Sequence, residues 1–571
     1  MNNLDRKARR PHAASYHRGF RAAVLTAASA FALISTPALA FEIDTGNPEV
    51  KIHWDTQVKY TAAFRVKKQS NKLTGTINLD DGDRNFDKGL ISNRVDLFSE
   101  FDLSYHGWGV RASGAGWYDQ VYNSKNDNDL GLTANKLGDN REFNQATQEL
   151  HGQKAELLDA FVFGKFNAGD TRVSFRAGRH ALQWGETLFF GGNGIAGGMA
   201  PIDIVKALSV PNVLFKELIR PVGQVSAQWQ LTSDLSIGAY YQYEWERSIL
   251  PGVGSYFSSA DIFDEGGEFF IPPAFANAFF GGGQSPRIDD DRARQQGQFG
   301  AQVRFRVPGW APDFGIYGIH YHAKAFSQAN LAVTGAGPTD IPTSYQLVYG
   351  EDITAVGASI SNTFGPVNIA AESSIRFNQP LASSVNVYVP GGFNFYAPGV
   401  AGVAANSDNK LWAIGRTIHA NVSALWSVSP YFLAKESVFV AEVAYNRLQK
   451  VTENPSFLNP YTDKNGLAIF LNYEPVYRQV LPGLDISVPM GVTYAPIGND
   501  AAGVFINQTG DDGGSANVGL SFTYLDVWRA GVQYTRFLGP TGVTIDGAGQ
   551  QHYDQPLKDR DFVSINLRRT F

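Results

Sequence analysis

Residues 52–66 read IHWDTQVKYTAAFRV, and this stretch decides the fold class. Apolar and aromatic side chains take the even positions, among them Trp54, Tyr60 and Phe64, whereas most odd positions are polar or charged. Because a strand turns alternate residues to opposite faces, the pattern predicts a strand with one apolar and one polar face. The segment is longer than the usual five or six residues of a soluble strand. It is long enough to cross a bilayer, which takes about 9–11 residues.

The same alternation recurs along the chain, and it recurs in pairs. Each pair is joined by a tight turn such as His106-Gly107, and long polar or Gly/Pro-rich segments separate the pairs. Short turns alternating with long loops are typical of an outer-membrane barrel, with the turns in the periplasm and the loops outside. We therefore predict an all-β fold, a single large antiparallel transmembrane β-barrel. We expect 18 strands, or 16 or 20 if the chain has one hairpin fewer or more than the pattern suggests. The 18 predicted strands are 52–66, 91–105, 108–119, 155–166, 172–181, 225–231, 235–245, 299–307, 314–324, 356–360, 367–377, 418–426, 439–445, 467–473, 484–494, 516–524, 528–537 and 562–571.

The amino-acid composition excludes several classes of protein and of metal site. The chain has 571 residues, of which 43% are hydrophobic and 18% charged, and it contains no cysteine. The lack of cysteine excludes disulfide scaffolds and thiolate metal sites. Beyond residue 40 no apolar run approaches the length of about 18 residues that a membrane helix needs. The net charge of −6 gives no basic patch for nucleic acid, so we expect no nucleic-acid partner.

Residues 1–40 are predicted to be a secretory signal peptide, and residues 41–571 the barrel. A basic segment precedes an apolar stretch at 22–34, and Ala38-Leu39-Ala40 matches a cleavage site. The alternative, a membrane anchor, conflicts with the short apolar stretch. Together the signal and the barrel predict the outer membrane of a Gram-negative bacterium, with lipid and lipopolysaccharide as surroundings.

The last strand ends the chain at Phe571. Val563, Ile565 and Leu567 alternate with polar residues up to that phenylalanine. The segment resembles the C-terminal insertion signal that the barrel-assembly machinery reads, although Arg569 stands where an apolar residue is commoner. The alternative is a soluble edge strand that happens to end in phenylalanine.

With the apolar faces turned to lipid, the polar faces line a lumen. Barrels of 16–18 strands leave an aqueous channel unless something fills it. Basic and acidic side chains are close to balanced on these faces, which argues against an anion pore with basic rows. The simplest alternative is that each charge pairs across strands. The candidate lumen residues are Arg94, Asp96, Glu100, Asp102, Arg111, Arg172, Arg176, Arg304, Arg306, His320, His322, Glu372 and Arg376.

Two long loops stand out. The glycine-rich segment 191–198 leads through Asp203 into apolar stretches at 204–208 and 213–219, which need cover, so we predict either an inward fold into the barrel or a lid packed on other loops. The second loop is rich in phenylalanine, which indicates contact with a hydrophobic ligand. Loop packing and lipopolysaccharide contact are the alternatives. Its phenylalanines are Phe257, Phe263, Phe269, Phe270, Phe275, Phe279 and Phe280.

One block carries a family resemblance. Segment 176–186 contains Gly178-Arg179-His180 and Trp184-Gly185-Glu186, and Pro201-Ile202-Asp203 follows. These residues and the start of the mature chain resemble the proteobacterial outer-membrane family known as DUF1302, with His180 where glutamine is commoner. The resemblance covers essentially the whole mature chain and implies a barrel with no established reaction.

The family's members are often linked with a periplasmic lipoprotein-carrier-like partner and an inner-membrane exporter of the resistance-nodulation-division type. The resemblance therefore implies movement of hydrophobic molecules across the envelope, and this carrier and exporter as possible partners. For the motif itself, we hypothesise that Arg179 and Glu186 form an ion pair that pins an inward loop, with Trp184 as its apolar anchor.

Enzyme chemistry is not expected. The histidines are scattered over separate strands and loops, and no G-x-S-x-G motif occurs at a strand-turn-helix signal. His320 and His322 lie two apart, but without a third ligand a lumen-wall pair is the simpler interpretation. We expect no cofactor and no metal. The expected function is passage of a small hydrophobic or amphipathic compound through a loop-occluded barrel. A diffusion porin for polar solutes and a docking component of an export complex are the alternatives.

Overall fold

The computed structural model describes residues 41–571 except 212, 214, 336–339, 429–433, 506–508 and 543–552. The predicted signal peptide, residues 1–40, and the turn expected near Pro430 lie outside these described residues. Within them, no helix is long and apolar enough to cross a membrane.

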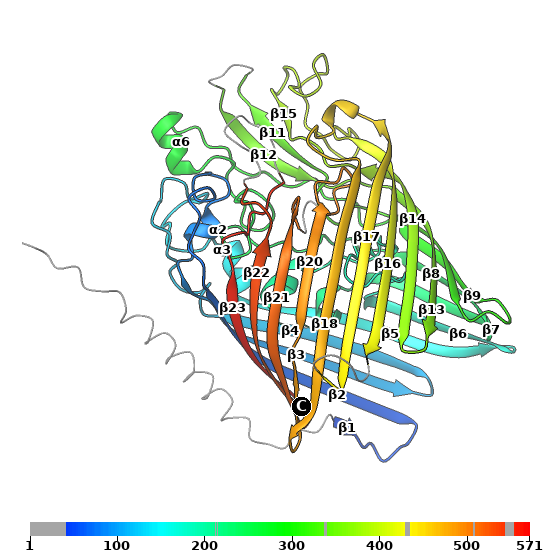
Figure 1. Ribbon diagram of the computed structural model, residues 1–571. Coiled ribbons are helices and arrows are strands. Elements are labelled where there is room, and N and C mark those ends of the chain that lie inside the picture. The colour runs from blue at the N-terminus through cyan, green and yellow to red at the C-terminus, as the bar shows by residue number, and fades with distance from the viewer. Residues whose placement is uncertain are drawn as a thin grey trace, which may run out of the picture.

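The described chain forms a closed transmembrane β-barrel of 18 wall strands (Figure 1). The main sheet has twenty strands, but β1 is a short addition that pairs with the wall strand β2, and β19 and β20 are two halves of one wall strand. Neighbours along the chain pair antiparallel, and β2 pairs with β23 to close the ring. The strands are β1 (Phe41–Ile43), β2 (Val50–Arg65), β3 (Gly89–Tyr105), β4 (Trp108–Asp119), β5 (Gln153–Ala168), β6 (Thr171–His180), β7 (Val222–Thr232), β8 (Leu235–Gln242), β9 (Gln298–Arg306), β10 (Asp313–Tyr321), β13 (Ile353–Phe364), β14 (Val367–Pro380), β16 (Ile414–Val428), β17 (Glu436–Glu453), β18 (Asn465–Leu481), β19 (Leu484–Ser487), β20 (Met490–Ile497), β21 (Gly513–Tyr524), β22 (Trp528–Leu538) and β23 (Phe562–Thr570).

The predicted strand count and order are confirmed, while several boundaries differ. Strand β18 runs eight residues beyond the predicted end at 473, and β17 runs to Glu453 rather than 445. The predicted strand 484–494 is broken between β19 and β20, where Pro489 lacks the N–H that a ladder needs. Such differences are expected, because the alternation marks a strand but not its ends.

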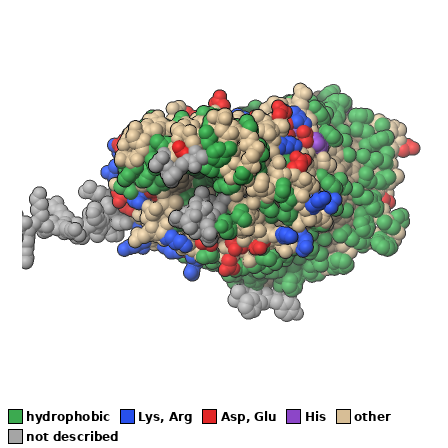
Figure 2. Space-filling model, turned by 90° about the horizontal axis from the view of Figure 1, so that it is seen from above, with side chains coloured by type: hydrophobic (Ala, Val, Ile, Leu, Met, Phe, Trp, Pro, Cys, Tyr) green, Lys and Arg blue, Asp and Glu red, His purple; other side chains and the backbone are tan. Residues whose placement is uncertain are grey.

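The outer wall is apolar, as the alternation predicts. Side chains such as Trp54, Val162, Trp229 and Ile316 point away from the barrel axis and are about half exposed. Seen from the loop end, hydrophobic side chains gather on the visible part of this wall (Figure 2). Because lipid cannot satisfy backbone groups, the closed sheet pairs them within the wall.

Tight turns lie at one end of the barrel and long loops at the other (Figure 1). The loops carry a small sheet, β12-β11-β15, which the sequence did not predict. They also carry short helices. The loops pack on each other and on wall strands through an apolar cluster that includes the loop residues Phe86, Tyr122, Phe143 and Tyr256. The loop-borne elements are α2 (Asp81–Arg84), α3 (Gln145–Thr147), η1 (Gln148–Gly152), η2 (Ile195–Gly198), α4 (Ile204–Ser209), α5 (Phe215–Leu218), α6 (Pro273–Phe279), β11 (Gln328–Val333), β12 (Pro342–Val348), β15 (Asn386–Tyr388) and η3 (Pro455–Phe457).

Candidate functional site

The segment between β6 and β7, residues 181–221, folds into the barrel, and we call it the inward loop. Its first half reaches wall strands that are far away in sequence. Phe189 stacks on Phe470 of β18, with ring centroids 3.5 Å apart, and Phe190 packs edge-on against Phe505. Of the two predicted arrangements, the structure therefore shows the inward fold and not the lid.

Two wall carboxylates bind the backbone of the inward loop. Glu442 of β17 accepts hydrogen bonds from the backbone N–H of Phe189, at 2.5 Å, and of Phe190, at 3.2 Å. Glu372 of β14 accepts from the N–H of Glu186, at 2.7 Å, and of Ile195, at 2.5 Å. Hydrogen bonds to a charged acceptor are stronger than those between neutral groups, so these two side chains hold the loop across the lumen.

Two glycines of the motif lie so close to neighbouring wall residues that a side chain would not fit. Gly185 has a positive φ of 101°, and a Cβ at this position would collide with the Glu372 carboxylate. Gly178 has a φ of 127°, and a Cβ there would collide with the carbonyl of Ala160 on β5. Both positions therefore need glycine for backbone conformation and for space.

The tip of the inward loop is bound by polar side chains of β14, β16 and β17. The Asn193 amide donates to Asn421 Oδ1, at 2.8 Å, and to the carbonyl of Tyr445, at 3.1 Å. The Arg376 guanidinium donates to the carbonyls of Gly192 and Gly194, both at 2.9 Å. These bonds satisfy a glycine-rich backbone that has no regular partner of its own.

Trp184 is the apolar anchor of the loop, as hypothesised. Its side chain is 7% exposed and lies edge-on to Tyr240 of β8, with ring centroids 5.0 Å apart. Ile195 and Met199 of the loop and Ile319 of β10 belong to the same buried cluster. Burial of this cluster holds the start of the loop against β8 and β10.

The second half of the inward loop contacts the opposite wall, β3 to β5. Glu156 of β5 pairs with Lys206, at 2.8 Å, and with Arg220, at 3.0 Å. Lys216 pairs with Glu100 of β3 at 3.0 Å. Asp203, a motif candidate, caps α4 by accepting from the N–H of Lys206 at 2.9 Å. The loop thus reaches both sides of the lumen.

The predicted ion pair between Arg179 and Glu186 is wrong. Arg179 pairs with Glu244, which follows β8, at 2.6 Å, and Glu186 pairs with Arg304 of β9 at 3.1 Å. The chain turns at Gly185, which carries Glu186 away from the strand that holds Arg179. His180 is buried and hydrogen-bonds to Ser226 of β7 at 2.8 Å.

Most of the predicted lumen residues lie on the inward face, and most are paired. Two pairs join neighbouring residues of the wall, Arg94–Asp96 and Arg111–Asp102, each at 2.7 Å. Others pair with a neighbouring strand or hold the inward loop, namely Arg306 (with Asp313), Arg304, Glu100, Glu372 and Arg376. Arg172 and Arg176 of β6 are exposed and form no ion pair with a described residue.

The prediction that His320 and His322 form a pair on the lumen wall is wrong. His320 lies on the outward face with Ile316 and stacks on Phe299, at 5.3 Å between ring centroids. Strand β10 ends at Tyr321, so His322 no longer follows the alternation. It is buried among the loops, where its ring bonds to the Gln296 carbonyl.

The phenylalanine-rich loop divides into two parts. Four phenylalanines pack on loops or wall strands and are buried or half-buried, namely Phe257 (on Phe562), Phe263 (on Phe326), Phe269 and Phe270 (on Tyr345). The other three, Phe275, Phe279 and Phe280, cluster on α6, where Phe279 is 62% exposed. Loop packing therefore explains four of the seven.

Three apolar side chains of the inward loop remain uncovered inside the barrel. Leu188, Phe189 and Phe215 of the inward loop are 44%, 47% and 60% exposed, and Phe215 precedes the Lys216 that pairs with the β3 wall. The sequence predicted that the apolar stretch 213–219, which contains Phe215, is buried against other residues, and for Phe215 this prediction is wrong. Exposed apolar side chains among charged ones are typical of contact with an amphipathic ligand. The exposure of these three side chains depends on the path of the loop through the lumen, which the sequence pattern alone does not show.

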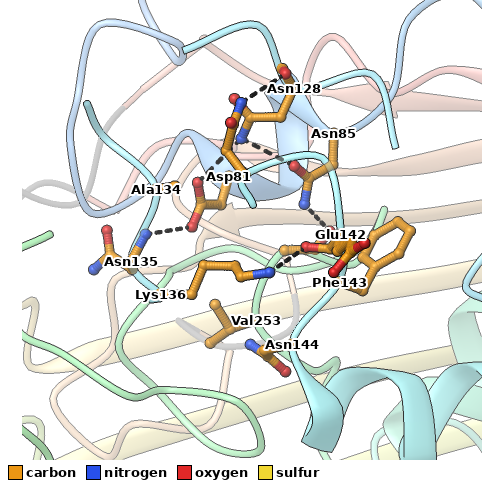
Figure 3. Close-up of a pocket in the computed structure, with 12 residues that line it drawn as sticks. Asp81, Asn85, Asn128, Ala134, Asn135, Lys136, Glu142, Phe143, Asn144 and Val253 are labelled. Atoms are coloured by element: carbon orange, nitrogen blue, oxygen red, sulfur yellow. Dashed lines mark hydrogen bonds between the residues drawn. The ribbon is translucent and has the colours of Figure 1, made fainter. Parts of the chain in front are cut away.

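A polar pocket lies outside the barrel, among the loops (Figure 3). It is lined by residues of the loops after β2, β4 and β8. Asp81, Asn85, Asn128 and Asn135 form a hydrogen-bonded group, and Lys136 and Glu142 lie below Asp81 and Asn85 in this view. It shares no residue with the lumen.

Comparison with known proteins gives a family. Residues 21–571 match the family model described as "Protein of unknown function (DUF1302)". Among curated proteins, none matches the sequence significantly.

Several solved structures are similar over most of the chain, at low identity. OccAB1 of Acinetobacter baumannii is 11% identical, over 91% of this chain and 96% of its own, with a TM-score of 0.41. OpdK of Pseudomonas aeruginosa, solved with vanillate, is 9% identical, over 91% and 98%, with a TM-score of 0.37. OmpT of Vibrio cholerae, an outer-membrane protein, is 10% identical, over 91% and 99%, with a TM-score of 0.33. The barrel fold of this chain rests on its own strand pairings.

Proposed function

The chain belongs to the DUF1302 family, and we propose that it is an outer-membrane channel occluded by its inward loop, which passes a small amphipathic or hydrophobic compound. The apolar outer wall and the closed ring of strands support the membrane location. The observation that carries the proposal is the exposed apolar surface of Leu188, Phe189 and Phe215 inside a charged lumen.

The lumen surface suits a molecule with two different ends. The exposed rings of Phe189 and Phe215 offer apolar contact, and the guanidinium groups of Arg172 and Arg176 lie on the β6 wall without an ion-pair partner among the described residues. An anionic or strongly polar head group and an apolar body would each find a matching surface. A solute without apolar surface gains nothing from Phe189 and Phe215.

Proteoliposomes provide the test. We expect the mature protein to pass anilinonaphthalene sulfonate, an apolar dye with one anionic group, faster than a sugar of similar size. The double variant F189S/F215S should slow the dye and leave the sugar rate unchanged. The matched control is F279S/F280S, which removes two phenylalanines outside the barrel. Large steady conductance in salt alone, with equal passage of dye and sugar, would favour a diffusion porin instead.

The proposal also includes two partners that the sequence suggested, the barrel-assembly machinery and a periplasmic carrier. We propose that the barrel-assembly machinery reads the C-terminal strand, in which Phe571 exchanges backbone hydrogen bonds with Thr56 of β2. Arg569, the departure from the usual signal, lies over the rings of Trp528 and Phe571, at 4.9 and 4.6 Å from the centroids. Turns of two residues, such as His106-Gly107, offer little surface to a periplasmic carrier. The channel role is therefore better supported than docking.

A further inference from the structure

Three acidic residues meet outside the barrel, where loops from distant parts of the chain pack together. Asp80 and Asp81 lie between β2 and β3, and Asp261 lies in the loop between β8 and β9. One carboxylate oxygen from each residue lies within 4.8 Å of the others, and all three side chains are buried. None of them belongs to the lumen site.

Each of these carboxylates uses only one of its oxygens fully. The bonded oxygens accept from Arg84 and Thr133 (Asp80 Oδ2), from the N–H of Asn135 (Asp81 Oδ2) and from the N–H of Asp81 (Asp261 Oδ2). In contrast, Asp80 Oδ1 and Asp261 Oδ1 are buried without any hydrogen-bond donor among the described residues. Asp81 Oδ1 has one long contact of 3.5 Å with the Asn128 amide.

A buried carboxylate oxygen without a donor is destabilising unless a cation or a proton meets it. Two such oxygens in one cluster, and a third with a weak contact, would be satisfied by a positively charged ligand at this place. The amide oxygen of Asn135, a residue already bonded to Asp81, is also buried, and no described residue donates to it. Figure 3 shows Asn128 and Asn135 on either side of Asp81.

A neighbouring cluster is balanced in formal charge, although Asp83 Oδ2 and Asp559 Oδ1 are also buried without a hydrogen-bond donor among the described residues. Asp83 and Asp559 are buried with two arginines, as Arg65 pairs with Asp83 at 2.6 Å and with Asp559 at 3.4 Å, and Arg560 lies 3.7 Å from Asp83. That cluster has two acids and two bases. Among the described residues, the three-carboxylate cluster pairs directly with one base, Arg84, which also pairs with the exposed Asp129. With all three carboxylates ionised the charge is −3 + 1 = −2, which one divalent cation would neutralise.

The protonation behaviour of the cluster agrees with this charge deficit. Burial raises the pKa of Asp80 to about 6, although Thr133 and Arg84 oppose the shift. Burial and repulsion from Asp80 raise the pKa of Asp81 to about 7. Burial, Asp81 and Asp80 raise the pKa of Asp261 as well. The charged forms are therefore costly until a cation is bound.

We propose that Asp80, Asp81 and Asp261 bind one Ca²⁺ ion, which ties together the loops after β2, β4 and β8. All the available ligand atoms are oxygens, from carboxylates and amides, and they come from an irregular set of loops. Ca²⁺ accepts such irregular oxygen cages, whereas Mg²⁺ keeps several waters and demands near-ideal octahedral geometry. This inference is independent of the proposed transport.

Calorimetric titration of the refolded mature protein in detergent tests the site. After EDTA treatment and desalting, CaCl₂ at neutral pH should bind at one site per chain, with a Kd of about 10⁻⁴ to 10⁻³ M, as in extracellular calcium modules. The variant D261N should weaken binding at least about tenfold, because it removes one ligand charge. MgCl₂ should bind more weakly than CaCl₂.

A matched control and a second measurement separate the ion from general loop damage. D289N removes an exposed aspartate from the same loop as Asp261 and should bind Ca²⁺ like the wild type. Ca²⁺ should also slow protease cleavage within 243–297 in the wild type and in D289N, but not in D261N. If D261N does not fold, as judged by heat-modifiable migration in gels, D81N replaces it. Absence of calcium binding by the wild type, or equal binding by the folded variant, would overturn the proposal and leave the carboxylates holding protons.

Discussion

The inward loop, residues 181–221, and the phenylalanine-rich loop between β8 and β9, residues 243–297, which we call the outer loop, differ in where they find their partners. Both are long, rich in glycine and apolar residues, and next to each other in the order of the hairpins. The inward loop is bound by the wall, mainly through Glu372 and Glu442. The outer loop is bound largely by other loops, for example through His151 and Thr147.

The difference shows that composition does not decide which loop enters a barrel. Apolar residues need cover in either place, and both loops have them. What differs is the supply of acceptors for free backbone N–H groups. Two carboxylates on the far wall meet four N–H groups of the inward loop. This supply makes the interior a stable location for an irregular segment.

Removal of the inward loop should have the largest effect. His180 and Val222 are paired neighbours in β6 and β7, so a short Gly/Ser linker can replace residues 182–220 without disturbing the wall. We expect conductance in planar bilayers to rise by about an order of magnitude, because an unfilled 18-strand barrel leaves an aqueous channel. Replacing α6 of the outer loop in the same way should leave conductance unchanged. Equal conductance with and without the inward loop would show that it does not occlude the lumen.

Loss of the wall carboxylates should have the next largest effect. E442L removes the acceptor for two backbone N–H groups, at a cost of about 1–3 kcal/mol for each. We expect frequent open events in single-channel records and faster protease cleavage near residue 190. E442Q keeps one acceptor oxygen and should lie between E442L and the wild type. If E442L and E442Q behaved alike, the hydrogen bonds would not be what holds the loop.

Truncation of the apolar anchor tests the other half of the attachment. W184A removes a buried ring at a cost of about 3–5 kcal/mol, part of which is lost loop attachment. Open events should increase, but less than in E442L, because Glu372 and Glu442 still hold the loop. W310A, which removes a tryptophan that is 65% exposed, is the control. Single-channel recording distinguishes these outcomes.

Acid should loosen the outer loop through His151. Burial lowers the pKa of His151 to about 3 from its ordinary 6.5, and its ring accepts from the N–H of Gly252. A lowered folded-state pKa means that the stability is fully present above pH 6.5 and is lost as pH falls toward 3. Cleavage within 243–297 should therefore rise with acid in the wild type and rise less in H151Q. Asp80 and Asp81, whose pKa values are raised, act in the opposite sense in both proteins. The difference between the wild type and H151Q therefore reports His151 alone. Identical pH profiles of cleavage in the two proteins would show that His151 does not stabilise the outer loop.

The exposed phenylalanines of α6 should matter least to the channel. F279S/F280S replaces side chains that are 62% and 37% exposed, so stability should change by about 0.5 kcal/mol or less. Conductance should stay at the wild-type value. A change in conductance would show that α6 contacts the permeation path and would weaken the contrast between the two loops.

The sequence by itself determined the wall. Strand number, strand order and the lipid-facing side follow from a period of two, which is a local property that residues such as Trp54 and Ile316 display without any partner. The same rule failed for His322, because β10 ends at Tyr321 and the period ends with it. The motif around Gly178 and Gly185 was also visible locally, and both glycines answer steric needs.

Only the tertiary structure decided what the loops do. The sequence left the inward fold and the lid open, and it paired Arg179 with Glu186 because they are close in the chain. Their real partners, Glu244 and Arg304, are 65 and 118 residues away. Asp81 and Asp261 are 180 residues apart. A loop takes its partners from whatever the closed barrel brings near, and closure is a property of the whole chain, so no local pattern records it.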